Sequence, residues 1–287
     1  MIRLGWLMRR NFMDKPAGWL LRRYYRYYMM RSAVRKGYNS NLQWPDLVFA
    51  QDDNHQPNQN DFQIFLDNHK NGNGIWKWCH YLDIYDRHFC KFRGQEVNVL
   101  EIGVYSGGSL EMWERYFGTK ANIYGVDINA ACRMYETDRI KIFIGDQKDH
   151  LFWRDVKLKI PALDIVIDDG GHGFEQQVVS LEELLPFMRP GGVYLCEDVQ
   201  GAFNRFASYV HGMGHKLNDY SLMCEFPDDN ERSIVCGCTP FQWAISSIHL
   251  YPFVTVFERN ERKITELRSP KRGTQWQSFL RGSAPRL

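Results

Sequence analysis

Short apolar runs alternate with helical patterns along the chain from residue 97 onward. The runs are rich in β-branched residues and lack polar alternation, which is typical of strands buried on both faces. They span residues 97–103, 122–128, 140–146, 163–169 and 191–198. The intervening segments, such as SLEMWERYFG (109–118) and FEQQVVSLEELLPFM (174–188), show the spacing of amphipathic helices. Strands that alternate with helices predict an α/β fold with a doubly wound, mostly parallel sheet.

An aromatic helix and a last pair of strands flank this alternation. Large apolar side chains recur at spacings of three and four in residues 75–89, which predicts an amphipathic helix. Residues 39–74 are polar and rich in Asn and Gly, so we expect loops around a short helix near Phe62 to Asp67. Residues 241–260 predict the last strands, joined to the sheet as an antiparallel edge. The chain therefore divides into an N-terminal helical extension with connecting loops (1–74), an α/β domain (75–262) and a basic C-terminal tail (263–287).

Composition narrows the class of protein. A chain of 287 residues with 44% hydrophobic content is long enough for one large core. No run approaches the roughly 18 apolar residues of a membrane span, and the N-terminus lacks a clean signal peptide. We therefore expect a soluble, cytoplasmic chain. The seven cysteines are odd in number and form no CxxC pair, so we expect reduced thiols and neither a disulfide framework nor a zinc site.

Charge is distributed unevenly. Residues 1–36 carry ten Lys or Arg against one Asp, a net charge of +9, which leaves −7 for the rest of a chain whose total is +2. Trp, Tyr, Leu and Met are interleaved with these arginines, as in an interfacial helix on the inner membrane surface or an arm on an acidic partner. The alternative is a helix packed on its own domain or on a second subunit of a homo-oligomer. Nucleic acid is a less favoured partner, because no nucleic-acid-binding motif accompanies the charge.

Polar residues stand at the carboxyl end of every predicted strand, where doubly wound sheets bind their ligands. The first strand ends in Glu101 and leads into the glycines of IGVYSGGS, with Ser109 as a cap for the next helix. Asp127 ends the second strand, where a carboxylate can accept both hydroxyls of an adenosine ribose. Asp146 and Gln147 end the third strand, where they could hydrogen-bond the edge of an adenine ring. Each residue alone is also explained as a loop cap, but the shared register favours a nucleotide-like ligand.

The fourth and fifth strands end in acids. DIVIDDGGH places Asp168, Asp169 and His172 at a strand tip, and LCEDV places Glu197 and Asp198 at the next one. Desolvating several carboxylates is costly unless a cation lies among them. The residues alone leave open whether Asp168 and Asp169 cap a helix and whether Glu197 and Asp198 merely begin a polar loop.

The motifs LEIGVYSGGSLEMW, GVDIN, GDQ, VIDDGGH and LCEDV occur in this order, after KWCHYLDIYDRHF. With them the sequence resembles the class I S-adenosylmethionine-dependent methyltransferases, which have a Rossmann-like fold. More narrowly it is similar to the metal-dependent sugar O-methyltransferases that act on macrolide-linked deoxysugars or rhamnose, a group that includes the cephalosporin-hydroxylase-like family. The resemblance covers roughly residues 75–200 and weakens beyond them, and we expect the methyltransferase domain to span residues 75–262.

The resemblance implies S-adenosylmethionine and Mg²⁺, or another hard divalent cation, as cofactors, and a sugar-containing acceptor. It implies that Asp169, Glu197 and Asp198 bind the metal and that His172 is the general base. Asp168 would contact the methionine moiety of the cofactor or brace the loop, and Glu101 would accept a hydrogen bond from the amino group of that moiety. The implied cofactor set is Glu101, Gly103, Tyr105, Ser106, Gly107, Ser109, Asp127, Ile128, Asp146, Gln147 and Asp168.

The chemistry requires these residue types. A sugar hydroxyl ionises far above pH 7, so it attacks a sulfonium methyl poorly unless a base removes its proton. A hard cation chelated by two vicinal hydroxyls would orient the acceptor and stabilise the developing alkoxide. The same logic suits a catechol-like aromatic diol, which is the alternative substrate. A non-catalytic membrane- or partner-binding module is the third hypothesis, and the intact set of acids argues against it.

Overall fold

The computed structural model describes residues 28–40, 60–219, 224–225, 233–270 and 272–273. The chain divides into two units, residues 1–56 and 57–287. In the first unit, residues 28–38 form a helix on which Tyr28 and Tyr38 are exposed, while the remainder of the predicted basic arm, residues 1–27, lies outside the described residues. Within the described ranges, no helix is both long and apolar enough to cross a membrane.

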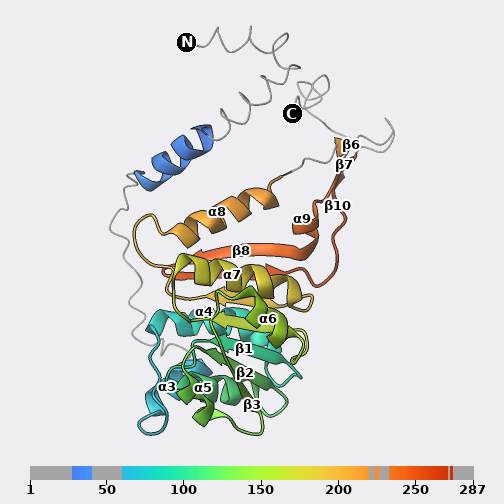
Figure 1. Cartoon of the computed structure of the whole chain (residues 1–287). Helices are drawn as coiled ribbons and strands as arrows, with labels where there is room; N and C mark the ends of the chain where they lie inside the picture. The colour runs from blue at the N-terminus through green and yellow to red at the C-terminus, as the bar shows by residue number, and fades with distance from the viewer. Residues whose placement is uncertain (1–27, 41–59, 220–223, 226–232, 271, 274–287) are drawn as a thin grey trace, which may run out of the picture. The chain divides into compact units, whose positions relative to one another are not determined.

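A seven-stranded sheet organises the second unit (Figure 1). Its order is β3-β2-β1-β4-β5-β9-β8. The first five strands pair in parallel and the last two are antiparallel, so the predicted doubly wound, mostly parallel sheet with an antiparallel edge is confirmed. The strands are β1 (Asn98–Ile102), β2 (Asn122–Asp127), β3 (Ile140–Ile144), β4 (Ile165–Asp168), β5 (Val193–Cys196), β8 (Ile245–Tyr251) and β9 (Val254–Arg259).

Helices cover both faces of the sheet. The central strands β1, β4 and β5 are buried along their whole length, and alternate residues enter two separate apolar clusters. One cluster includes side chains of α3, α4 and α5, and the other includes side chains of α6, α7 and α8. The helices are α3 (Asp61–Asn68), α4 (Cys79–Phe89), α5 (Gly108–Phe117), α6 (His150–Lys157), α7 (Phe174–Leu184), α8 (Arg205–Leu217) and α9 (Pro240–Ala244). Short 3-10 turns lie at Cys90–Phe92, Ala130–Tyr135 and Leu185–Phe187.

The strand order changes direction between β1 and β4. From β1 it proceeds outward through β2 to β3 and then returns to place β4 on the other side of β1. Ile102 of β1 is paired in register with Asp168 of β4, so the loops that follow these two strands leave the sheet side by side. A doubly wound sheet binds its ligand in the crevice at such a switch point.

Two segments differ from the pattern expected from the sequence. Helix α4 begins at Cys79, because the residue before it, Trp78, has an extended backbone. A second, three-stranded sheet contains β6 (Cys224–Glu225), β7 (Ser233–Gly237) and β10 (Glu266–Pro270), of which β10 belongs to the predicted tail.

The expectation of reduced thiols is wrong at one position. Cys236 is disulfide-bonded. It lies in β7, where it is paired in register with Cys224 of β6. Among the cysteines whose side chains the structure describes, Cys79, Cys90, Cys132, Cys196 and Cys238 are free.

Candidate functional site

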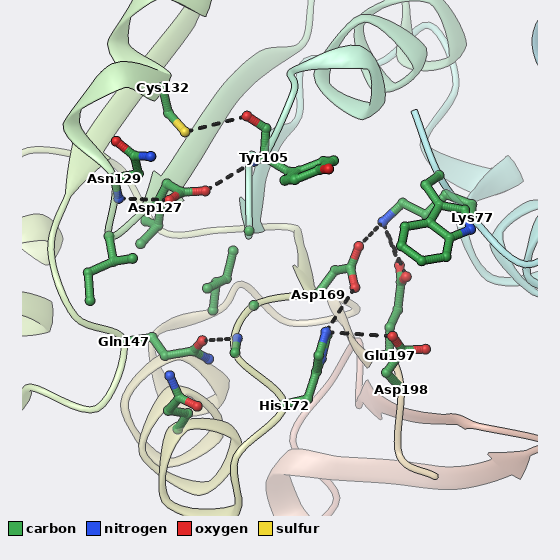
Figure 2. A pocket seen from close by; sticks show the side chains of 18 of the residues that line it. Lys77, Tyr105, Asp127, Asn129, Cys132, Gln147, Asp169, His172, Glu197 and Asp198 are labelled. Atoms are coloured by element: carbon green, nitrogen blue, oxygen red, sulfur yellow. Dashed lines mark hydrogen bonds and ion pairs between the residues drawn. The ribbon is translucent and has the colours of Figure 1, made fainter. Parts of the chain in front are cut away.

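A cavity of about 550 Å³ opens at the carboxyl ends of the parallel strands (Figure 2). The ends of β1 and β2 and the loops that follow all five parallel strands contribute residues to its lining, which confirms that the strand ends meet at one place. The lining residues that the sequence singles out are Gly103, Tyr105, Asp127, Ile128, Asp146, Gln147, Asp169, His172, Glu197 and Asp198. Five other predicted residues lie outside the lining: Glu101, Ser106, Gly107, Ser109 and Asp168.

The loop after β1 depends on two glycines. Gly103 has a φ of +92°, and a Cβ atom placed there would lie 2.0 Å from the carbonyl oxygen of Asp169. Gly107 has a φ of +77°, and its Cβ atom would lie 2.6 Å from the ring of Tyr135. Both conformations are strained for any residue with a side chain. The loop therefore packs backbone to backbone against the loop after β4.

Ser109 does not cap the helix that follows this loop, so that prediction is wrong. Gly107 is the N-cap residue of α5, and Ser109 lies inside the helix. The Ser109 hydroxyl donates instead to Oε2 of Glu101 at 2.6 Å. A buried carboxylate offers a stronger acceptor than a neutral partner, and this bond fixes Glu101 beneath the loop.

Asp127 joins the end of β2 to the glycine loop. Its Oδ2 atom accepts hydrogen bonds from the backbone amides of Val104 and Tyr105, each at 3.0 Å, and its Oδ1 atom accepts from the amide of Asn129 at 2.8 Å. The neighbouring Ile128 is exposed at the cavity. A carboxylate oxygen has two lone-pair directions, so Asp127 retains acceptor capacity toward a ligand.

Gln147 and Asp168 brace the loops around the cavity. The Gln147 amide donates to Oδ1 of Asp168 at 3.0 Å, and its Oε1 atom accepts from the backbone amide of Gly171 at 2.7 Å. Asp168 also accepts from the Tyr194 hydroxyl at 2.9 Å. Burial raises the pKa of Asp168 to about 7, although these hydrogen bonds oppose the shift. Of the two roles considered for Asp168, these contacts support bracing the loop.

Four carboxylates converge from the ends of β1, β4 and β5. Glu101 and Glu197 are almost fully buried, whereas Asp169 and Asp198 are partly open to the cavity. Oε1 of Glu197 accepts from the Tyr85 hydroxyl at 2.6 Å, and Oδ1 of Asp198 accepts from the Tyr81 hydroxyl at 2.7 Å. Burial and the charge of Asp169 raise the pKa of Glu197, and a cation beside this carboxylate favours its ionised form.

Lys77 supplies one such cation, and sequence reasoning missed it. Its Nζ atom donates to Asp169 at 2.6 Å and lies 3.2 Å from Glu197 (Figure 2). It also lies 3.3 Å from Glu101. Burial lowers the pKa of Lys77, but the three carboxylates more than reverse this and raise it well above its usual range. The available signal was the position of this lysine between Trp76 and Trp78, at the start of the motif KWCHYLDIYDRHF.

His172 lies at the mouth of this cluster. Its Nε2 atom is 3.5 Å from Oδ2 of Asp198 and 3.9 Å from Oδ1 of Asp169. His172 and Asp198 have positive φ angles of 55° and 54°, and Tyr105 of the glycine loop has one of 51°. Non-glycine residues in this region carry strain that is concentrated at functional sites. These three residues line the same cavity, whereas Phe203 and Phe253, the other non-glycine residues with positive φ in the described ranges, do not.

The donor set fits a hard divalent cation. Lys77 contacts three of the four carboxylates, all except Asp198, and carboxylate oxygens are the ligands that such a cation prefers. Ligand atoms of Asp169, His172 and Asp198 all lie within 4.8 Å of one another. Glu197 differs from the other two predicted ligands, because both of its oxygens contact Lys77.

The curated relatives of this chain are sugar O-methyltransferases. The 8-demethyl-8-alpha-L-rhamnosyl tetracenomycin-C 2'-O-methyltransferase of Streptomyces olivaceus is 33% identical over 205 residues, which cover 66% of this chain and 53% of that enzyme. The mycinamicin VI 2''-O-methyltransferase of Micromonospora griseorubida is 42% identical over 126 residues, which cover 42% of this chain and 31% of that enzyme. No family model matches the chain.

A solved structure shares the fold. It is the MycE methyltransferase from the mycinamycin biosynthetic pathway in complex with Mg, SAH and mycinamycin VI, with a TM-score of 0.57 and 27% sequence identity over 71% of this chain and 54% of that one. The resemblance identified in the sequence is therefore confirmed. The chain spans about half the length of the first relative and about a third of the second.

Proposed function

We propose that this chain, which has the class I methyltransferase fold and is related to the sugar O-methyltransferases, transfers a methyl group from S-adenosylmethionine to a sugar hydroxyl. One observation carries the proposal: a cluster of carboxylates with His172 at its mouth shares a cavity with the glycine loop and Asp127. Cofactor-binding and proton-accepting groups therefore face the same space, as methyl transfer requires.

The cofactor half of the cavity is formed by the loops after β1, β2 and β3. Gly103 has no side chain, so the loop after β1 lies close to the loop after β4 and leaves room for a ligand at the strand ends. Asp127 presents a carboxylate to the ribose hydroxyls of the cofactor. The side chain of Gln147 donates to Asp168 and accepts from the amide of Gly171. Gln147 therefore contributes to adenine binding by holding the loop after β4 in place. The MycE methyltransferase structure contains SAH, the product of this cofactor.

Asp169 and Asp198, with Glu197 behind them, are the residues that would hold a divalent cation. When bound, Mg²⁺ supplies positive charge that orients acceptor oxygens and stabilises a developing alkoxide. The MycE methyltransferase structure contains Mg. The contribution of the chain itself is to hold these carboxylates in place through the hydroxyls of Tyr81 and Tyr85.

His172 removes the proton of the acceptor hydroxyl. Its Nε2 atom is the ring nitrogen that faces the cavity acids, and the positive charge formed on the ring is stabilised by Asp198 and Asp169 at 3.5 and 3.9 Å. The backbone of His172 has a φ of 55°, and strain of this kind is concentrated at functional sites. Removal of the proton as the oxygen attacks the methyl group is what makes a sugar hydroxyl reactive near neutral pH.

A methyl-transfer screen tests the proposal. Purified protein is incubated with S-adenosylmethionine labelled in its methyl group and Mg²⁺, together with rhamnose-bearing glycans and glycosides or with catechols. We expect label in the sugar, and none when the Asp169→Asn variant replaces the wild type. Transfer only to catechols would overturn the sugar acceptor, and transfer to neither would overturn the proposed activity.

The contacts that the N-terminal residues make with partners are also a prediction. Residues 1–36 would contact an anionic membrane or the second subunit of a homo-oligomer. Removing them would weaken binding to vesicles that contain anionic lipid in the first case, and would lower the molar mass in solution in the second.

A further inference from the structure

The segment before α4 places a charged side chain inside the protein and two aromatic side chains outside it. Trp76 and Trp78 are 88% and 50% exposed, whereas the side chain of Lys77 between them is 2% exposed. Alternation of this kind is that of an extended segment, and it directs the Lys77 ammonium group toward the ends of β1, β4 and β5. All three residues line the cavity.

The ammonium group of Lys77 is shared among carboxylates of both halves of the site. It lies 3.3 Å from Glu101, which supports the glycine loop through Ser109, and 2.6 Å from Asp169. It is also 3.2 Å from each oxygen of Glu197. An ammonium group has three protons, so these three acids satisfy its donors.

Most of these acids have other anchors besides Lys77. Glu101 accepts from the Ser109 hydroxyl and Glu197 from the Tyr85 hydroxyl, each at 2.6 Å. Replacing Lys77 by a side chain of similar length without charge would therefore remove positive charge while these hydrogen bonds persist. The contribution that Lys77 alone makes is electrostatic.

We propose that Lys77 is a resident counter-cation and a positioning residue of this site. It neutralises the buried part of the carboxylate cluster, formed by Glu101 and Glu197, and leaves the outer oxygens of Asp169 and Asp198 for the divalent cation. Lys77 thereby limits the affinity for that cation and holds the acids together when no cation is bound. The inference rests on the proposed metal site.

The sign of the expected effect follows from Coulomb repulsion. A positive charge 2.6 Å from a metal ligand opposes the binding of a second cation, and the buried surroundings screen this repulsion weakly. Lys77→Met should therefore tighten Mn²⁺ binding at least about tenfold. Lys77→Arg retains the charge, so its affinity for Mn²⁺ should stay within about threefold of that of the wild type.

Mn²⁺ titration by calorimetry measures this directly, without an acceptor and without turnover. Lys148→Met is the matched control, because Lys148 pairs with Asp146 beside the same cavity but is exposed. Its Mn²⁺ affinity should be unchanged. The double variant Lys77→Met with Glu101→Gln removes both members of one buried ion pair, so it restores the charge balance and is expected to fold even where the single variant does not. Its Mn²⁺ affinity should lie within about threefold of the wild type.

The outcomes separate the two proposals. Unchanged or weaker Mn²⁺ binding by folded Lys77→Met, or binding by the double variant that is weakened at least about tenfold, would overturn the role of Lys77 while the metal site stands. Binding by Lys77→Met but not by the wild type would support the counter-cation and overturn the proposed metal requirement. Binding by neither protein would overturn both.

Discussion

Gly103 and Asp169 are in backbone contact at the switch point of the sheet. A Cβ atom at Gly103 would lie 2.0 Å from the Asp169 carbonyl oxygen, and the φ of Gly103 is +92°. Gly103→Ala must therefore separate the loops after β1 and β4. We expect a lower melting temperature and SAH affinity reduced at least about tenfold, measured by thermal unfolding and by calorimetry.

Gly118→Ala separates backbone strain from collision. Gly118 has a φ of +87°, but a Cβ atom there meets no other atom within 4 Å. This variant should lose stability through its φ angle and keep its SAH affinity. If Gly103→Ala binds SAH as well as Gly118→Ala does, the close approach of the two loops has no role in cofactor binding.

Asp127→Asn tests how the glycine loop is held. The Oδ2 atom of Asp127 accepts from the amides of Val104 and Tyr105 and its Oδ1 atom accepts from the amide of Asn129, and an asparagine cannot accept with both of its terminal atoms. We expect SAH affinity to fall about tenfold or more, since the loop loosens and the ribose loses a carboxylate. The exposed Asp155→Asn serves as control. If the two variants bind SAH with equal affinity, Asp127 has no role in cofactor binding.

His172→Ala separates a base from a metal ligand. A base is needed only for turnover, so kcat should fall at least about a hundredfold while the affinities for SAH and Mn²⁺ stay within about threefold. The position of His172 beside Asp169 and Asp198 also allows metal ligation. Mn²⁺ affinity that falls together with kcat would show that His172 acts as a ligand and would contradict its assignment as the base.

His88 should make the stability of the fold depend on pH, at a place outside the cavity lining. Burial lowers the pKa of His88, and His249 and Arg87 act in the same direction, while Glu258, 2.8 Å away, opposes them. The folded state therefore prefers the neutral ring. Its contribution is fully present above the unfolded pKa of about 6.5 and is lost as the pH falls toward the lower folded value.

Urea unfolding between pH 7.5 and 5.5 measures this effect, a range chosen to bracket about 6.5. The free energy of unfolding of the wild type should decline toward the acidic end. His88→Gln lacks the titrating ring, so its slope should be smaller. The exposed His150→Gln is the control, and equal slopes for His88→Gln and this control would contradict the role of His88.

The fold and the position of the site could be predicted because both depend on short-range sequence patterns. Strands buried on both faces appear as continuous apolar runs, and parallel strands bring their carboxyl ends together wherever they lie in the sequence. Asp127, Asp169 and Asp198 could be located in this way, and the structure brings them to one cavity.

The residues that sequence reasoning missed act across long separations or from irregular backbone. Tyr81 and Tyr85 have the spacing of core aromatics, and their hydroxyl partners lie 117 and 112 residues away. Lys77 precedes the helix on an extended segment, where helical periodicity gives no direction to a side chain. The prediction that Ser109 caps a helix is wrong because its hydroxyl donates to Glu101 instead.

Calorimetric titration of SAH into the purified chain in the presence of Mg²⁺ tests the central claim most directly. The cavity formed by the glycine loop, Asp127 and the carboxylate cluster predicts saturable binding at one site per chain. Binding should weaken in Asp127→Asn and persist in His172→Ala. No saturable binding by the wild type would contradict the assignment of this cavity to S-adenosylmethionine, and with it the proposed methyl transfer.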